Sequence, residues 1–313
     1  MEMIVPAVGS TVCGPLGVAH LPRMWLKAVL KATDRLPEGW FSSNRGMDKR
    51  VIDNLGLPAE EFFAFLSEVP TYPQTEAWVS ARSDKLDAAS LAAHNEAVAS
   101  FKVPQENGVP RRAALGIEHT DIWEGIRLND FDDWNCLHAA VTQDRGAKRT
   151  PIVPLVSAHT VGTLGVAGLP RLWAKAIIHG AGALPDQYRS GAVRVVYTDG
   201  RPAMVPAPGG VDAAVLEHLG LDLDATSAYL LAEAPSYLAF EDWVRANATR
   251  LESATVAAHN AGPWQVDGER PAAELARIGF GHVPVPCNTF SYNDYGDWSL
   301  LHAQLAEVRG ATA

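Results

Sequence analysis

One segment of this sequence occurs twice. LGVAHLPRMWLKAV (16–29) returns as LGVAGLPRLWAKAI (164–177), and ten of the fourteen residues are identical. The Leu-Pro-Arg, Trp and Lys positions are kept, whereas His20 is replaced by Gly168. An internal repeat is a strong constraint on the fold, because each copy is expected to form the same supersecondary unit.

The repetition extends along the whole chain. Further matched segments are 46–57 with 210–221, 91–97 with 256–262, and 129–146 with 293–310. The offset grows from 148 to about 164, so the second copy carries roughly sixteen extra residues near 191–206. Alternating apolar residues before an Asp-Gly pair predict a β-hairpin there. We therefore expect two domains, 1–148 and 149–313, of ordinary domain size.

Within each copy the apolar period is helical. Pro22 suits the first turn of a helix, and residues 58–69 begin with proline and glutamates, as helix N-termini do. Asp130 and Asp133, like Asp294 and Asp297, have the spacing of a capping box and predict a helix start. The predicted fold is mainly α, with two tandem homologous helical domains related by pseudo-twofold symmetry and a β-hairpin insertion in the second.

The repeated motifs resemble those of a known family. They are the LPR-x-W-x-K-A helix, the segment from Asp48 (or Asp212) to Leu-Gly-Leu, the A-A-x-N helix and the closing D-x-x-x-W stretch. Each copy is similar to the small bacterial DUF5069 domain, whose function is unknown. The resemblance implies an aromatic residue at positions 94 and 259 and an aliphatic one at 138 and 302. This chain has histidine at all four, which makes them candidates for specialised chemistry.

The candidate catalytic residues are therefore histidines. His94 and His259 follow two alanines on a helix, and His138 and His302 lie one turn after a tryptophan. If both helices of a copy pack on one core, its two imidazoles can approach each other and titrate as a coupled acid and base. His20 adds a third imidazole to the first copy. We therefore expect the histidine pair of the first copy to carry most of the catalytic activity. The alternative is that these histidines are hydrogen-bonded core residues.

Other repeated residues are candidates for substrate binding. Arg23 and Lys27, four apart on one helical face, could hold an anion, as could Arg171 with Lys175. The remaining candidates for a pocket wall are Trp25, Trp173, Asn95 and Asn260. Alternatively, the arginines and lysines form a solvent-exposed edge of the helix, and the tryptophans pack in the core.

Cofactors and several partners are not expected. The sequence has no Walker loop, no dinucleotide-binding glycine motif and no G-x-S-x-G elbow. Two histidines and a carboxylate per copy could bind a metal, yet no short ligand spacing supports it, so none is assigned. A formal net charge of -10 argues against nucleic acid. Three cysteines without C-x-x-C spacing and no signal or membrane segment predict a cytoplasmic protein.

The preferred hypothesis is an enzyme of specialised metabolism. It would act on a small organic molecule by histidine acid/base chemistry without a nucleotide cofactor, as a lyase, isomerase or cyclase. Two alternatives stay open, a metal-dependent enzyme that uses the repeated His and Asp residues and a non-catalytic small-molecule binding protein. The oligomeric state is open as well.

Overall fold

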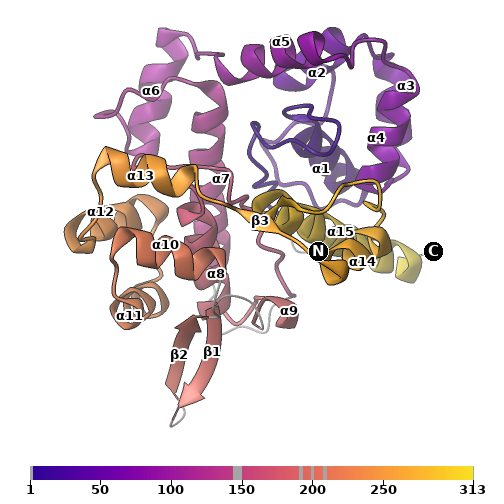
Figure 1. Cartoon of the computed structure of the whole chain (residues 1–313). Coiled ribbons are helices and arrows are strands. Elements are labelled where there is room, and N and C mark those ends of the chain that lie inside the picture. Colours follow the sequence, from indigo (N-terminus) through magenta and orange to yellow (C-terminus); the bar gives the residue numbers. More distant parts are fainter. Residues whose placement is uncertain (1–2, 144–149, 190–192, 199–200, 207–209, 313) are drawn as a thin grey trace. The chain divides into compact units, whose positions relative to one another are not determined.

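The fold is mainly helical, as the periodicity predicts. The computed structural model (Figure 1) describes residues 3–143, 150–189, 193–198, 201–206 and 210–312. Strands β1 (Val193–Thr198) and β2 (Arg201–Pro206) pair antiparallel, so the predicted hairpin is confirmed. Its predicted Asp-Gly turn lies outside the described residues. The homology and pseudo-symmetry of the two copies stay predictions.

The chain divides into two compact units. Unit 1 comprises Met1–Ala114, Asp121–Asp130 and Trp264–Ala313, and unit 2 comprises Leu115–Thr120 and Phe131–Pro263. The compact units therefore do not coincide with the domains expected at 1–148 and 149–313. Each unit takes its closing segment from the other repeat.

The helices fall into these units as follows. Unit 1 contains α1 (Leu21–Ala32), α2 (Gly46–Leu55), α3 (Ala59–Ser67), α4 (Tyr72–Ser80), α5 (Ala88–Ala99), α6 (Gln105–Leu115) but for its last residue, α14 (Glu269–Arg277) and α15 (Thr289–Thr312), with the short strands β3 (Gln265–Val266) and β4 (Cys287–Asn288). Unit 2 contains α8 (Leu169–Gly180), α9 (Asp186–Arg189), α10 (Val211–Leu219), α11 (Leu223–Glu233), α12 (Tyr237–Asn247) and α13 (Ser253–Asn260). Helix α7 (Gly125–Thr142) starts in unit 1 and continues into unit 2.

The repeated motifs form matching helix boundaries. Both α1 and α8 have the proline of Leu-Pro-Arg in the first turn, where no backbone N–H donor is lost to the helix. Helices α2 and α10 both end at a left-handed glycine, Gly56 (φ 65°) and Gly220 (φ 62°), which explains the Leu-Gly-Leu motif.

The capping prediction for the closing aspartates is wrong. Helix α7 begins at Gly125, more than one turn before Asp130, and α15 begins at Thr289, before Asp294. All four aspartates are buried inside these helices: Asp130, Asp133, Asp294 and Asp297. The capping-box spacing was matched by chance, since aspartates one turn apart also share one face of a helix.

Aromatic packing explains why the closing helix of each repeat belongs to the compact unit formed by the other repeat. In unit 1 the Tyr72 ring lies 5.4 Å from that of Trp25 and 4.6 Å from that of Trp298. Trp298 belongs to the yellow helix α15 in Figure 1 and is 2% exposed. The closing tryptophan thus fills the core of the other repeat's helices, and burying so large a side chain is strongly stabilising.

Unit 2 uses the same arrangement with its own residues. The ring of Tyr237 lies 5.4 Å from that of Trp173 and 4.4 Å from that of Trp134. Trp134 lies on α7 and therefore comes from the first repeat. The exchange of closing helices is reciprocal.

Candidate functional site

The repeated arginines and tryptophans bind the protein's own backbone. Arg23 is 4% exposed, and its Nη1 donates hydrogen bonds to the carbonyls of Pro6 (2.7 Å) and Val8 (2.9 Å). Arg171 makes the matching pair of bonds, both 3.0 Å, to the segment before α8. The indoles of Trp25 and Trp173 are buried and donate to the carbonyls before α4 and α12 at 2.8 and 2.9 Å.

His94 and Asn95 fasten the loop that precedes α1. His94 Nε2 donates to the Ala19 carbonyl (3.0 Å), while Asn95 accepts from Ala19 N (2.9 Å) and donates to the Gly17 carbonyl (2.8 Å). The Asn54 amide donates to His94 Nδ1 (3.0 Å), which requires a neutral ring. Burial lowers the pKa of His94 as well. This histidine is a neutral structural donor.

His259 and Asn260 hold the loop before α8 in the same way. His259 Nε2 donates to the Ala167 carbonyl (2.8 Å), and Asn260 accepts from Ala167 N (2.9 Å). The Nδ1 atoms of His259 and His218 lie 2.7 Å apart, so the exposed His218 donates the shared proton. Burial, the larger cause, and the nearby His218 lower the pKa of His259.

His138 and His302 each donate a hydrogen bond to strained backbone of their own unit. His138 Nε2 donates to the Ala234 carbonyl (2.8 Å) and His302 Nε2 to the Val69 carbonyl (2.9 Å). Both acceptors are non-glycine residues with positive φ, 40° at Ala234 and 60° at Val69. His94 belongs to unit 1 and His138 to unit 2, so the two imidazoles of the first repeat do not share a unit. The expected coupled pair is therefore not present within either unit.

His20 has different chemistry. It is 1% exposed, and its Nε2 donates to Asp48 Oδ1 (2.9 Å), which also accepts from Lys27 Nζ (2.6 Å). Burial lowers the pKa of His20 to about 4, against the opposing effect of Asp48. Burial acts to raise the pKa of Asp48, but the His20 hydrogen bond and the Lys27 charge hold it below its ordinary value. At neutral pH this is a neutral imidazole on an Asp-Lys ion pair, and its Nδ1 is buried without a hydrogen-bond partner in the described part of the chain.

The structure explains why the second repeat has glycine at this position. Gly168 and His20 are both left-handed, with φ of 81° and 68°. A Cβ at Gly168 would come within 2.9 Å of Val215 and 3.2 Å of Val211. Asp212 pairs there with Lys175. The ion pair thus recurs in both units, and the imidazole is particular to unit 1.

Glu76 is a buried acid that the sequence argument missed. Its Oε1 accepts from Leu16 N (3.1 Å), and its Oε2 is buried and has no hydrogen-bond partner within the described ranges. Burial raises the pKa of Glu76 to about 7, despite the opposing hydrogen bond from Leu16. Burial and the Glu76 charge raise the pKa of Cys13 to about 11, so this thiol is protonated and unreactive at neutral pH.

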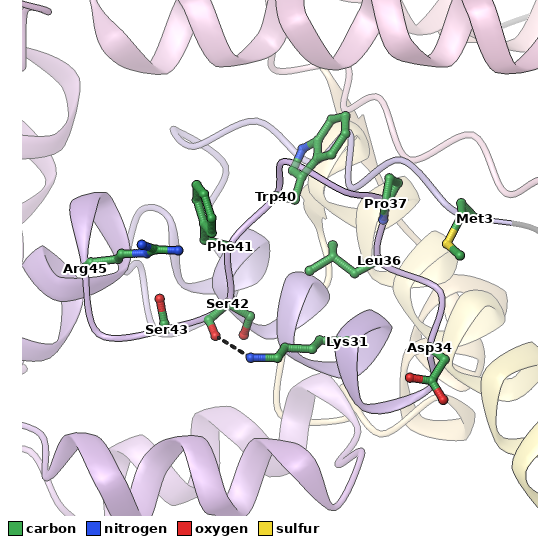
Figure 2. A pocket seen from close by; sticks show the side chains of 10 residues that line it. All are labelled: Met3, Lys31, Asp34, Leu36, Pro37, Trp40, Phe41, Ser42, Ser43 and Arg45. Atoms are coloured by element: carbon green, nitrogen blue, oxygen red, sulfur yellow. Dashed lines mark hydrogen bonds between the residues drawn. The ribbon is translucent and has the colours of Figure 1, made fainter.

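A pocket lies on the surface of unit 1, away from all these groups. Figure 2 shows it between the end of α1, the following loop and the N-terminal segment. Its volume is about 380 Å³, and its lining is Met3, Lys31, Asp34, Leu36, Pro37, Trp40, Phe41, Ser42, Ser43 and Arg45. None of the sequence-predicted site residues lines it.

Local hydrogen bonds shape this pocket. Arg35 N returns to the Leu30 carbonyl (2.8 Å) and ends α1, and the Arg35 carbonyl accepts from Ile4 N (2.8 Å). That bond places Met3 beside the loop. Lys31 Nζ donates to the Ser42 carbonyl (3.3 Å), which ties the far end of the loop back to α1.

A second hollow on unit 1 is mostly apolar. It is about 510 Å³ and is lined by Phe65, Glu68, Val69, Pro70, Gln74, Ala77 and Trp78. The rings of Phe65 and Trp78 stack 5.6 Å apart. It contains one acid and no cation, so it offers less for fixing a ligand's orientation.

Within the described ranges, no three His, Cys, Asp or Glu side chains gather to hold a metal ion. No helix in the same ranges is long and apolar enough to cross a bilayer. Comparison with family models, with curated proteins and with solved structures gave no match.

Proposed function

We propose that the protein binds a small organic molecule in the pocket of Figure 2, without catalysis by the repeated histidines. The observation that carries this is that the lining holds most of the large apolar side chains that stay exposed in the described part of the chain. Of the three large apolar side chains that stay exposed among the described residues, two line this pocket, Met3 (52%) and Phe41 (56%). Apolar groups left in water beside a hollow mark binding sites.

The composition and size of the lining support the same proposal. Trp40, Leu36 and Pro37 add apolar wall, while Lys31 and Arg45 supply directed polar groups. Ligand sites usually combine a mostly apolar wall with a few such groups, in volumes of roughly 300–1,000 Å³. The histidines, in contrast, are already bonded to backbone carbonyls.

A neutral aromatic probe tests the proposal. Titration with 2-naphthalenemethanol is expected to shift the backbone amide NMR signals of Phe41 and Ser43 with a saturable curve. Phe41→Ser should weaken binding about fivefold or more, because it removes apolar contact area. The matched control is Trp78→Ala, in the second hollow, which should leave the affinity unchanged. Shifts confined to other segments, or no saturable shift, would refute this site.

The acid/base enzyme is a second candidate, favoured by one observation. His20 is oriented by Asp48, and no described residue binds its Nδ1 lone pair. An oriented neutral imidazole is the usual form of a general base. Its test is an activity screen for proton-transfer reactions on the wild type and on His20→Gly, the residue that the second repeat has here. Equal activity of both would remove His20 from any reaction.

A further inference from the structure

We infer that the ligand of this pocket is a small organic monoanion, a carboxylate or sulfonate on a flat apolar body. This inference rests on the proposed function and names its ligand class. The first support is charge. The lining contains Lys31, Arg45 and one acid, Asp34, so it is net positive, whereas the whole chain has a formal charge of -10. A local positive site on an acidic protein attracts an anion that the rest of the surface repels.

The second support is the set of hydrogen-bond donors at one end. Among the described residues, Lys31 Nζ makes one hydrogen bond, to the Ser42 carbonyl, although an ammonium group has three N–H donors. Ser43 Oγ is buried and has no hydrogen-bond partner among the described residues. Arg45 Cζ lies over the Phe41 ring, 3.6 Å from its centre, and a guanidinium carries five N–H donors. These groups can bind the oxygens of one carboxylate or sulfonate.

The third support is the distribution of lining groups along the pocket. Figure 2 shows Arg45, Phe41 and Ser43 at one end, Met3 and Asp34 at the other, and Lys31 reaching toward Ser42. The apolar residues Trp40, Leu36 and Pro37 lie between, so an apolar body there would have its anionic group beside Arg45. Asp34 repels a second negative charge at the far end. The pocket therefore favours a monoanion over a dianion.

The experiment compares two isosteric probes by calorimetry. Naphthalene-2-carboxylate is expected to bind the full chain about tenfold more tightly than neutral naphthalene-2-carboxamide at low salt, since hydrogen bonds to charged groups exceed neutral ones. Raised salt should reduce the ratio. Arg45→Gln and Lys31→Met should bring the ratio of the two affinities close to one, and taking the ratio within each variant removes any effect of the substitution on the shape of the pocket. Lys49→Met is the matched control, because Lys49 is paired with Asp53 outside the pocket.

Each outcome decides between the two proposals. Equal affinity for both probes would overturn the anion inference and leave the binding proposal standing. No binding of either probe would overturn both. A carboxylate preference that survives Arg45→Gln and Lys31→Met would place the anion elsewhere and also overturn the inference. Asp34→Asn should strengthen carboxylate binding, and a weakening would contradict the stated orientation.

Discussion

Two buried glutamates make a natural comparison at the scale of single residues. Glu241 in unit 2 accepts from Thr163 through the backbone N–H (3.0 Å) and the hydroxyl (2.5 Å). The position that matches Thr163 in the first repeat is Pro15, which has neither donor. Glu76 therefore lacks two donors that would favour its charged form, and burial determines its pKa.

This predicts a pH-dependent stability. The pKa of Glu76 is about 7 in the folded chain, above its ordinary value of 4.5, so its stabilising contribution is full below pH 4.5 and lost as pH rises through 7. Within that window the loss is about 1.4 kcal/mol per pH unit. Pro15→Thr should reduce this loss by supplying donors. Urea unfolding of both chains at pH 5 and pH 8 measures it, and an identical pH dependence would contradict it.

The hydrogen bond from His94 to the Ala19 carbonyl leads to a second prediction. His94→Ala should lower the free energy of unfolding by about 2–4 kcal/mol, because it leaves a buried Ala19 carbonyl unpaired and opens a cavity. Binding of naphthalene-2-carboxylate in the pocket of Figure 2 should persist at temperatures where the variant is folded. Chemical unfolding and calorimetry measure the two effects. Lost binding with unchanged stability would show that His94 belongs to a binding site.

The closing helices make a prediction at the scale of elements. Trp298→Ala should raise deuterium uptake in α1 and α4, because Trp298 packs on Trp25 and Tyr72. Trp134→Ala should raise it in α8 and α12 instead. Each variant is the control for the other. If each substitution loosened the helices of its own repeat, the exchange of closing segments would be incorrect.

Sequence patterns predicted elements better than their packing. Leu-Pro-Arg and Leu-Gly-Leu fixed helix boundaries because proline and left-handed glycine act locally. The closing aspartates misled because the capping spacing also describes two residues on one helical face. Which repeat each closing tryptophan packs against is a long-range choice that no local pattern contains, since a Trp–Tyr pair is present in both, Trp25 with Tyr72 and Trp173 with Tyr237.

Across the molecule, the residues that recur in both repeats belong to the scaffold. The recurrent Arg, Trp, His and Asn residues hold loops and helix ends in both units. The pocket lies on 31–45, where the second repeat continues into the hairpin segment and shares little sequence. A residue needed for folding recurs in both copies, whereas a ligand site is required only once. Residues 31–45 differ from the second repeat, and this difference is the sequence feature that could have indicated the pocket.

The reciprocal exchange predicts how a divided chain behaves. Unit 1 includes Trp264–Ala313, which belongs to the second repeat. Unit 2 includes the end of the first repeat, from Phe131 onward. Fragments 1–148 and 149–313, expressed together, should therefore copurify one to one, since separating them exposes both aromatic cores. Trp134→Ala with Trp298→Ala should weaken the association. Size-exclusion chromatography with light scattering measures it. Two fragments that elute as separate folded monomers would show that each repeat can close on its own helix, and that the exchange is not needed for folding.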